Sequence, residues 1–137
     1  MSHVWLGDFS ALYLELGALN PSRRRRRDGS KGHPRGEITI YAGFSWRIER
    51  GSSIVAGSSS APSRRLASLK RLRGAKVTAA KYVSRLPELQ LRFSNGLWLL
   101  TGSTFEGQPQ WSISINARRI TSIDVVRGKL HVTQRGS

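Results

Sequence analysis

The chain of 137 residues carries 23 lysines and arginines against eight acidic residues, contains no cysteine, and has a pI of about 11.7. This length suits one domain with a hydrophobic core, and the absence of cysteine excludes disulfides and thiolate metal sites. No apolar run reaches the roughly 18 residues that a membrane-spanning helix needs, and the N-terminal stretch lacks the basic start of a signal peptide. We therefore expect a cytoplasmic protein.

The net charge of +15 is concentrated in two stretches of the chain. The arginine segment, residues 22–36, holds seven basic residues and one acidic residue. The helix–strand module, residues 62–85, holds eight basic residues and no acidic one. The rest of the chain is close to neutral, so the sequence indicates a globular scaffold with two basic modules and a polyanionic partner.

Along the chain the dominant hydrophobic period is two residues, which predicts half-buried strands. Phe44, Trp46 and Ile48, for example, alternate with polar residues, and Asn95-Gly96 joins two such patterns in the manner of a two-residue hairpin. The clear strands cover residues 10–16, 37–42, 44–49, 88–93 and 110–115. Shorter candidates cover residues 53–56, 76–83, 97–100, 122–126 and 129–133.

A helix is predicted over residues 63–73, because Pro62-Ser63 forms an N-terminal signal and Gly74 a stop. Its leucines, Leu66, Leu69 and Leu72, recur every third residue and are expected to pack on the sheet. The polar residues Arg64, Ser68 and Arg71 are expected on the opposite side of the helix.

The two halves of the chain resemble each other in the order of their patterns. The corresponding residues are Leu12-x-Leu14-x-Leu16 and Leu89-x-Leu91-x-Phe93, Ile38-Thr-Ile40 and Leu97-Trp-Leu99, Trp46-Arg-Ile48 and Trp111-Ser-Ile113, and Ser53-Ile54-Val55 and Ser122-Ile123-Asp-Val125. We predict one β-rich α+β domain over residues 1–137, a curled antiparallel sheet, sandwich or open barrel of about eight or nine strands. In this prediction residues 18–36 are a basic loop insertion, and residues 57–74 are a linker and basic helix between the similar halves.

Guanidinium groups suit phosphate oxygens, and a helix N-terminus also favours phosphate, so both basic modules are candidate nucleic-acid contacts. The alternative interpretation is a solvated, variable insertion in the first module and an ordinary polar helix surface in the second. The candidate binding residues are Arg23, Arg24, Arg25, Arg26, Arg27, Lys31, Arg35, Arg64, Arg65, Lys70, Arg71, Arg73, Lys76, Lys81 and Arg85.

Aromatic residues near basic ones can stack on unpaired bases. Trp46 and Trp111 alternate with polar residues and are better read as core residues, whereas Tyr41 and Trp98 are the candidates for stacking. The three histidines are widely separated in the chain, and the sequence shows no catalytic or cofactor-binding motif, so we expect no metal, no cofactor and no enzymatic activity.

The strings Leu89-Gln-Leu91-Arg-Phe93-Ser-Asn95-Gly96 and Pro109-Gln-Trp111-Ser-Ile113 resemble a pattern in small, uncharacterised bacterial domains. In those domains a strand, a turn, a second strand and a tryptophan-bearing strand form one half of the chain, and Gly36-Glu37 through Trp46-Arg47 is similar to the other half. The resemblance implies a repeated β-rich fold and, since some of these domains are suspected immunity proteins, an interaction with another protein. The arginine segment departs from the pattern, and the resemblance supplies no catalytic residues.

The expected function is non-enzymatic binding of nucleic acid through phosphate contacts with little base readout. An alternative is a protein-interaction module, either an immunity-type protein or a complex subunit, that docks on an acidic partner. A peripheral membrane protein is the least supported alternative, because the chain lacks an amphipathic anchor with bulky apolar residues.

Overall fold

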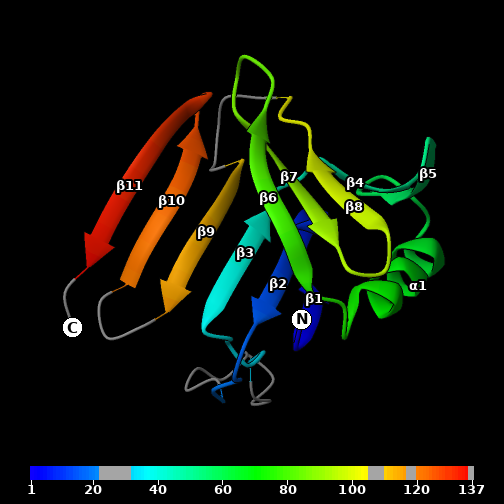
Figure 1. The fold of residues 1–137 in the computed structure, drawn as a ribbon, viewed down its shortest axis with the longest axis horizontal. Helices are drawn as coiled ribbons and strands as arrows, with labels where there is room; N and C mark the ends of the chain where they lie inside the picture. The colour runs from blue at the N-terminus through cyan, green and yellow to red at the C-terminus, as the bar shows by residue number, and fades with distance from the viewer. Residues whose placement is uncertain (22–31, 105–109, 117–119, 136–137) are drawn as a thin grey trace.

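The computed structural model describes residues 1–21, 32–104, 110–116 and 120–135 (Figure 1). These residues form eleven strands in two antiparallel sheets that do not close into a barrel, and one α-helix. The β-rich class with one short helix is therefore confirmed. The expected eight or nine strands were too few. All ten candidate segments form strands, and the strand at His3–Leu6, which is too short to show a period, is the eleventh.

Both sheets combine strands from distant parts of the chain. The six-stranded sheet has the order β1 (His3–Leu6), β2 (Leu12–Leu16), β3 (Ile38–Ala42), β9 (Trp111–Asn116), β10 (Ile120–Val126) and β11 (Lys129–Arg135). The five-stranded sheet has the order β6 (Val77–Val83), β7 (Glu88–Phe93), β8 (Leu97–Thr101), β4 (Trp46–Arg50) and β5 (Ser53–Gly57). A short 3₁₀ turn, Asp8–Ser10, connects β1 to β2.

The strand orders of the two sheets correspond to each other. The order β1-β2-β3-β9-β10 in one sheet corresponds to the order β6-β7-β8-β4-β5 in the other. The numbers of the first three strands rise by five, and those of the last two fall by five. The registers correspond as well, because Ile40 pairs with Leu14 and Ile113, and Leu99 in the equivalent place pairs with Leu91 and Ile48. Strand β11 has no counterpart in the five-stranded sheet.

The inner faces of both sheets contribute to a single hydrophobic core. Trp46 and Trp111 are buried in it, as predicted, and each indole satisfies its N–H within the fold. Trp46 Nε1 donates to the carbonyl of Ser10 at 2.7 Å, and Trp111 Nε1 donates to the carbonyl of Pro87 at 2.9 Å. Both tryptophans therefore serve packing and are not available for stacking on bases.

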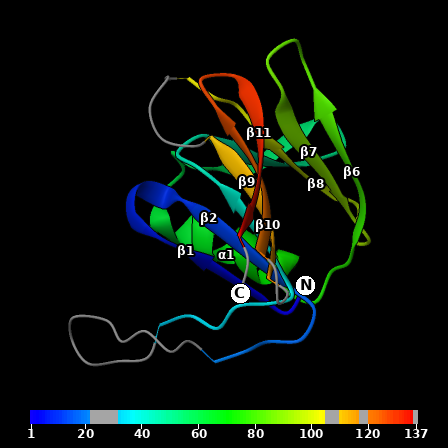
Figure 2. The ribbon, with the colours of Figure 1, turned by 90° about the vertical axis from the view of Figure 1, so that its left-hand side faces the viewer.

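Helix α1 (Pro62–Leu72) packs beside β1 and β5 (Figure 2). Leu69 and Leu72 are buried as expected, but Leu66 is exposed and Ser68 is buried. The expected leucine stripe was wrong because an α-helix turns 100° per residue, so a spacing of three drifts by about 60° at each step. Ser68 completes the buried face by donating to the carbonyl of Arg65 at 2.7 Å. No helix in the described part of the chain has the length and apolarity to cross a membrane.

Candidate nucleic-acid interface

The arginine segment leaves the six-stranded sheet at the end of β2 and returns to it at β3. Its two arms are held together by backbone hydrogen bonds between Asn20 and Arg35, at 2.8 and 3.0 Å. The carboxylate of Glu37 accepts a further bond from the amide of Ala18 at 2.9 Å. Of the candidate residues of this segment, Arg23–Arg27 and Lys31 lie outside the described residues, whereas Arg35 is described and exposed.

A buried carboxylate fixes the returning arm to the outer face of the sheet. Glu15 is buried, and its Oε1 accepts hydrogen bonds from the amide of Gly36 at 3.1 Å and from the hydroxyl of Thr39. Its Oε2 lies 3.4 Å from Nε1 of Trp5, which donates to it. A buried carboxylate is tolerated only when it is hydrogen-bonded in this way, so the arm and the carboxylate depend on each other.

Asn116, at the end of β9, orients the one described cation of this arm. Its side-chain amide donates to the carbonyl of Gly36 at 3.0 Å and to the hydroxyl of Thr39 at 2.7 Å. Its Oδ1 accepts a hydrogen bond from the guanidinium of Arg35 at 3.0 Å. Since this bond engages one nitrogen, the exposed guanidinium keeps other N–H groups for a phosphate.

An aromatic row lies beside the arm on the same outer face. The β-ladder places Trp5 opposite Tyr13 and Tyr13 opposite Tyr41. The rings of Trp5 and Tyr13 stack with centroids 3.9 Å apart, and the rings of Tyr13 and Tyr41 lie tilted at 5.2 Å. Burial raises the pKa of both tyrosines above the usual value of 10.0.

Of this row the sequence analysis proposed only Tyr41 for stacking. The alternation of Tyr13 with the leucines of β2 was visible in the sequence, but its proximity to Trp5 and Tyr41 depends on the strand register. Trp98, the other candidate, lies half-buried on the five-stranded sheet, where the guanidinium of Arg92 sits 5.3 Å from its ring centroid. The two candidates therefore do not share a face.

The end of α1 meets the arginine segment at the N-terminal strand. The amide of Gly74 donates to the carbonyl of Met1 at 3.0 Å, which ties the helix end to β1. Two residues further on, at the start of β1, His3 Nε2 lies 3.0 Å from Nδ1 of His33, and the His33 ring stacks on Trp5 at 4.3 Å. Burial lowers the pKa of His3, and the positive charge of Arg73 lowers it further.

The remaining cations of the helix–strand module spread along two elements. Arg65 is half-buried and its guanidinium donates to the hydroxyl of Ser10, while its buried Nε has no hydrogen-bond partner. Strand β6 starts beside α1 and runs toward the opposite end of the molecule (Figure 1), and Arg85 belongs to the connection that follows β6 at that end. The exposed cations of the module are Arg64, Lys70, Arg71, Arg73, Lys76, Lys81 and Arg85.

These cations are not neutralised by carboxylates of the described residues. Within residues 1–21, 32–104, 110–116 and 120–135 the ion pair found is that of Arg47 with Glu49, on β4. None of the candidate binding residues takes part in it. The positive charge of the helix–strand module is therefore open to an external anion.

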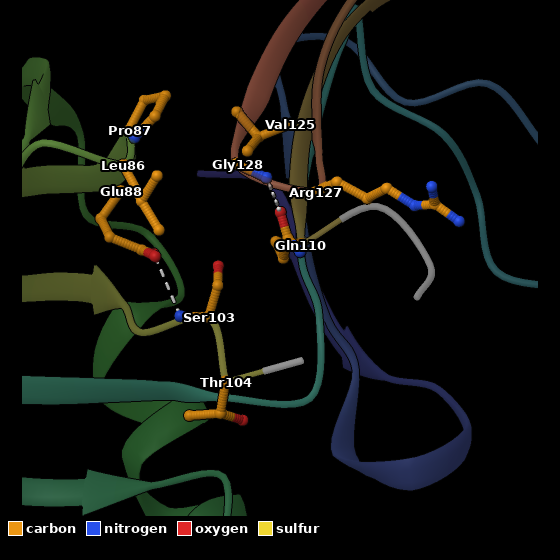
Figure 3. A pocket seen from close by; sticks show the side chains of 9 residues that line it. All are labelled: Leu86, Pro87, Glu88, Ser103, Thr104, Gln110, Val125, Arg127 and Gly128. Atoms are coloured by element: carbon orange, nitrogen blue, oxygen red, sulfur yellow. Dashed lines mark hydrogen bonds between the residues drawn. The ribbon is translucent and has the colours of Figure 1, made fainter. Parts of the chain in front are cut away.

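A hollow of about 270 Å³ lies at the other end of the sheets, between the β6–β7 loop, the residues after β8 and the β10–β11 turn (Figure 3). Glu88 lines it, but its carboxylate accepts bonds from the Thr101 hydroxyl at 2.5 Å and the Ser103 amide at 2.9 Å. Arg127 extends away from the other lining residues (Figure 3). The hollow thus offers no cluster of cations, and it is separate from the arginine segment.

No family model, curated protein or solved structure matches this chain. Among the residues with described positions, no group of three or more histidine, aspartate and glutamate side chains is placed to hold a metal ion. The site is therefore defined by its own geometry: basic residues at a helix end, a hydrogen-bonded loop arm, and an aromatic row beside it.

Proposed function

We propose that the protein is a non-enzymatic module that binds nucleic acid through phosphate contacts. The arginine segment and the C-terminal end of α1 would hold one strand of nucleic acid across β1. The observations that carry this proposal are the His3–His33 contact and the hydrogen bond from the Gly74 amide to the Met1 carbonyl, because together they bring the base of the arginine segment next to the helix end. The absence of ion pairs on the described cations of both modules supports it.

The aromatic row favours a strand with unpaired bases over a duplex. Tyr41 and Tyr13 are half-buried, so part of each ring remains accessible beside the basic arm. Base–aromatic stacking contributes about 1–3 kcal/mol per base and is insensitive to sequence. We therefore propose phosphate contacts with little base readout, with Tyr41, at the β3 end of the aromatic row, as the stacking residue.

The corresponding strand orders of the two sheets also support the proposed origin of the fold from two similar halves joined by α1. In that arrangement the arginine segment occupies the β2–β3 connection, whereas the equivalent β7–β8 connection is the short turn at Asn95-Gly96. The arginine segment is thus an insertion into one of two equivalent hairpins. This agrees with a binding function that resides in the insertion and not in the repeated strands.

The experiment is a comparison of salt dependence among variants, using fluorescence anisotropy with a labelled single-stranded oligonucleotide and its duplex. If about six phosphates are contacted, the slope of log K against log salt should be near −5 on duplex DNA and shallower on a single strand. Replacing Arg23–Arg27 by alanine should flatten the slope and leave the melting temperature nearly unchanged. Alanine at Arg50 and Lys129, exposed cations outside both modules, is the matched control and should change neither.

A second candidate function is a protein-interaction module that docks on an acidic partner, as an immunity-type protein or a complex subunit would. The specific observation that favours protein binding is an exposed apolar surface at the other side of the molecule, described below. Nuclease treatment of a pull-down separates the two functions, because a protein partner bound directly would remain after the nucleic acid is digested.

A further inference from the structure

The inner face of the six-stranded sheet is left uncovered at its β11 side. Leu130 and Val132 belong to the face that turns toward the core, yet 41% and 64% of their surface is exposed. Ile115 on β9 and Tyr82 on the edge strand β6 are also exposed, at 46% and 52%. We call these four residues, Ile115, Leu130, Val132 and Tyr82, the open corner.

The corresponding strand orders explain why this corner is open. At the opposite side of the molecule, α1 packs against β5 and β1 and closes the corner between the two sheets. In the equivalent place stand β10 and β6, and among the described residues no helix packs there. Instead the chain continues into β11, which extends one sheet beyond the other and leaves its apolar side chains in solvent (Figure 1).

We propose that the open corner binds an amphipathic helix of a partner protein, in the place that α1 occupies at the opposite corner. The floor of the site is formed by Leu130 and Val132, and its wall by Tyr82, whose ring lies 5.6 Å from that of the buried Trp111. A helix with an apolar stripe buries such a surface efficiently, as Leu69 and Leu72 do on the other side.

The charge around the open corner determines the polar face of the partner helix. Cations border it at one end: Arg85 follows the strand of Tyr82, and Arg127 belongs to the turn between β10 and β11, before Leu130. Of the described acidic residues nearest in sequence, Asp124 belongs to the opposite face of the sheet, because it alternates with the buried Val125. The carboxylate of Glu88 is hydrogen-bonded to Thr101 and Ser103. The partner helix should therefore carry glutamate or aspartate beside its apolar stripe.

The four residues of this site are separate from the proposed nucleic-acid contacts, and of the candidate nucleic-acid-binding residues Arg85 borders the site. It lies at the β6–β11 side, whereas the arginine segment and the end of α1 meet at β1. The two surfaces can thus be tested separately, and a substitution in the open corner should leave oligonucleotide binding unchanged.

The probe is a stapled synthetic helix with the sequence of α1, residues 62–72, carrying R64E, R65E, K70E and R71E. The matched control peptide keeps the native cations. Binding is measured by fluorescence anisotropy, and the site is mapped by backbone NMR shifts of the full-length protein. We expect the acidic peptide to bind and the basic peptide to bind at least about tenfold more weakly, with shifts at Tyr82, Leu130 and Val132.

The decisive variant is Val132→Asp, compared with Ile54→Asp. Both are exposed β-branched residues on edge strands, at 64% and 65%, but Ile54 lies on β5, away from the open corner. Val132→Asp should weaken binding of the acidic peptide about tenfold or more, and Ile54→Asp should leave it within about twofold. Equal losses in both variants, shifts confined to other surfaces, or no binding at about 1 mM peptide would overturn the proposal. A dimer in sedimentation that Val132→Asp dissociates would overturn it too, because a second copy would then occupy the corner.

Discussion

His3 on strand β1 and His33 on the returning arm of the arginine segment lie with their ring nitrogens Nε2 and Nδ1 3.0 Å apart. This contact joins the first residues of the chain to a segment thirty positions later. The positive charge of Arg73, at the end of α1, also lowers the pKa of His3, so the same pair links the arginine segment to the end of α1. The base of the arginine segment and the C-terminal end of α1, remote in sequence, therefore lie close together at this point.

The burial of His3 predicts a pH dependence of stability. Burial and Arg73 lower the pKa of folded His3 below its ordinary value of 6.5, so the unfolded chain takes up the proton first as the pH falls. The free energy of unfolding should decrease below pH 6.5 and stop decreasing once the folded state is also protonated. Thermal melts between pH 8 and pH 5 should show a smaller loss in His3→Gln than in the native chain. If His131→Gln, on β11, reduces the loss equally, the burial of His3 is not its source.

The buried carboxylate of Glu15 predicts a large effect of a small substitution. Glu15→Gln replaces one carboxylate oxygen by an NH2 group, which cannot accept a hydrogen bond from the donors around it. A buried polar group left without a partner lowers the free energy of unfolding by about 1–3 kcal/mol. Urea denaturation should show a loss of this size. The exposed Glu37 accepts one bond from Ala18, so Glu37→Gln should cost less than about 1 kcal/mol. Equal costs at the two positions would contradict the anchoring role of Glu15.

The distribution of cations predicts which of them contact phosphate. Arg73 lies at the end of α1, next to the base of the arginine segment. Arg73→Ala should weaken oligonucleotide binding and reduce the slope of log K against log salt by about one unit. Arg85→Ala, at the far end of β6, should leave the slope unchanged. Fluorescence anisotropy at several salt concentrations measures both. A larger effect of Arg85 than of Arg73 would move the binding surface to the other end of the molecule.

The aromatic row predicts a preference for unpaired bases. Tyr41→Ala should weaken binding of a single-stranded oligonucleotide by about 1–3 kcal/mol and leave duplex binding nearly unchanged. Trp98→Ala, on the other sheet, is the control and should affect neither. Equal effects of Tyr41→Ala on single strand and duplex would argue against stacking.

Much of the local structure was predictable from the sequence. The alternation of apolar and polar residues located ten of the strands to within a few residues, and it identified Trp46 and Trp111 as core residues. These features depend on short-range periodicity, which is a property of the sequence itself. The helix was also located correctly, although the rotation per residue placed Leu66 in solvent and Ser68 in the core.

The candidate site was less predictable because it depends on contacts between distant strands. The burial of Glu15 follows from the arm that folds over it, and the row of Trp5, Tyr13 and Tyr41 follows from the register of three strands. The exposure of Leu130 and Val132 follows from the unequal width of the two sheets. None of these is encoded in a local pattern, so charge alone indicated where to look.

The most direct test of the account is the affinity of the native protein for a labelled single-stranded oligonucleotide at 50 mM and at 500 mM salt. Contacts with about six phosphates predict a slope near −4 on a single strand, so the dissociation constant should rise by roughly four orders of magnitude between the two conditions. Equal affinity at both salt concentrations, or no binding at 50 mM, would contradict the proposal that the two basic modules hold a nucleic acid.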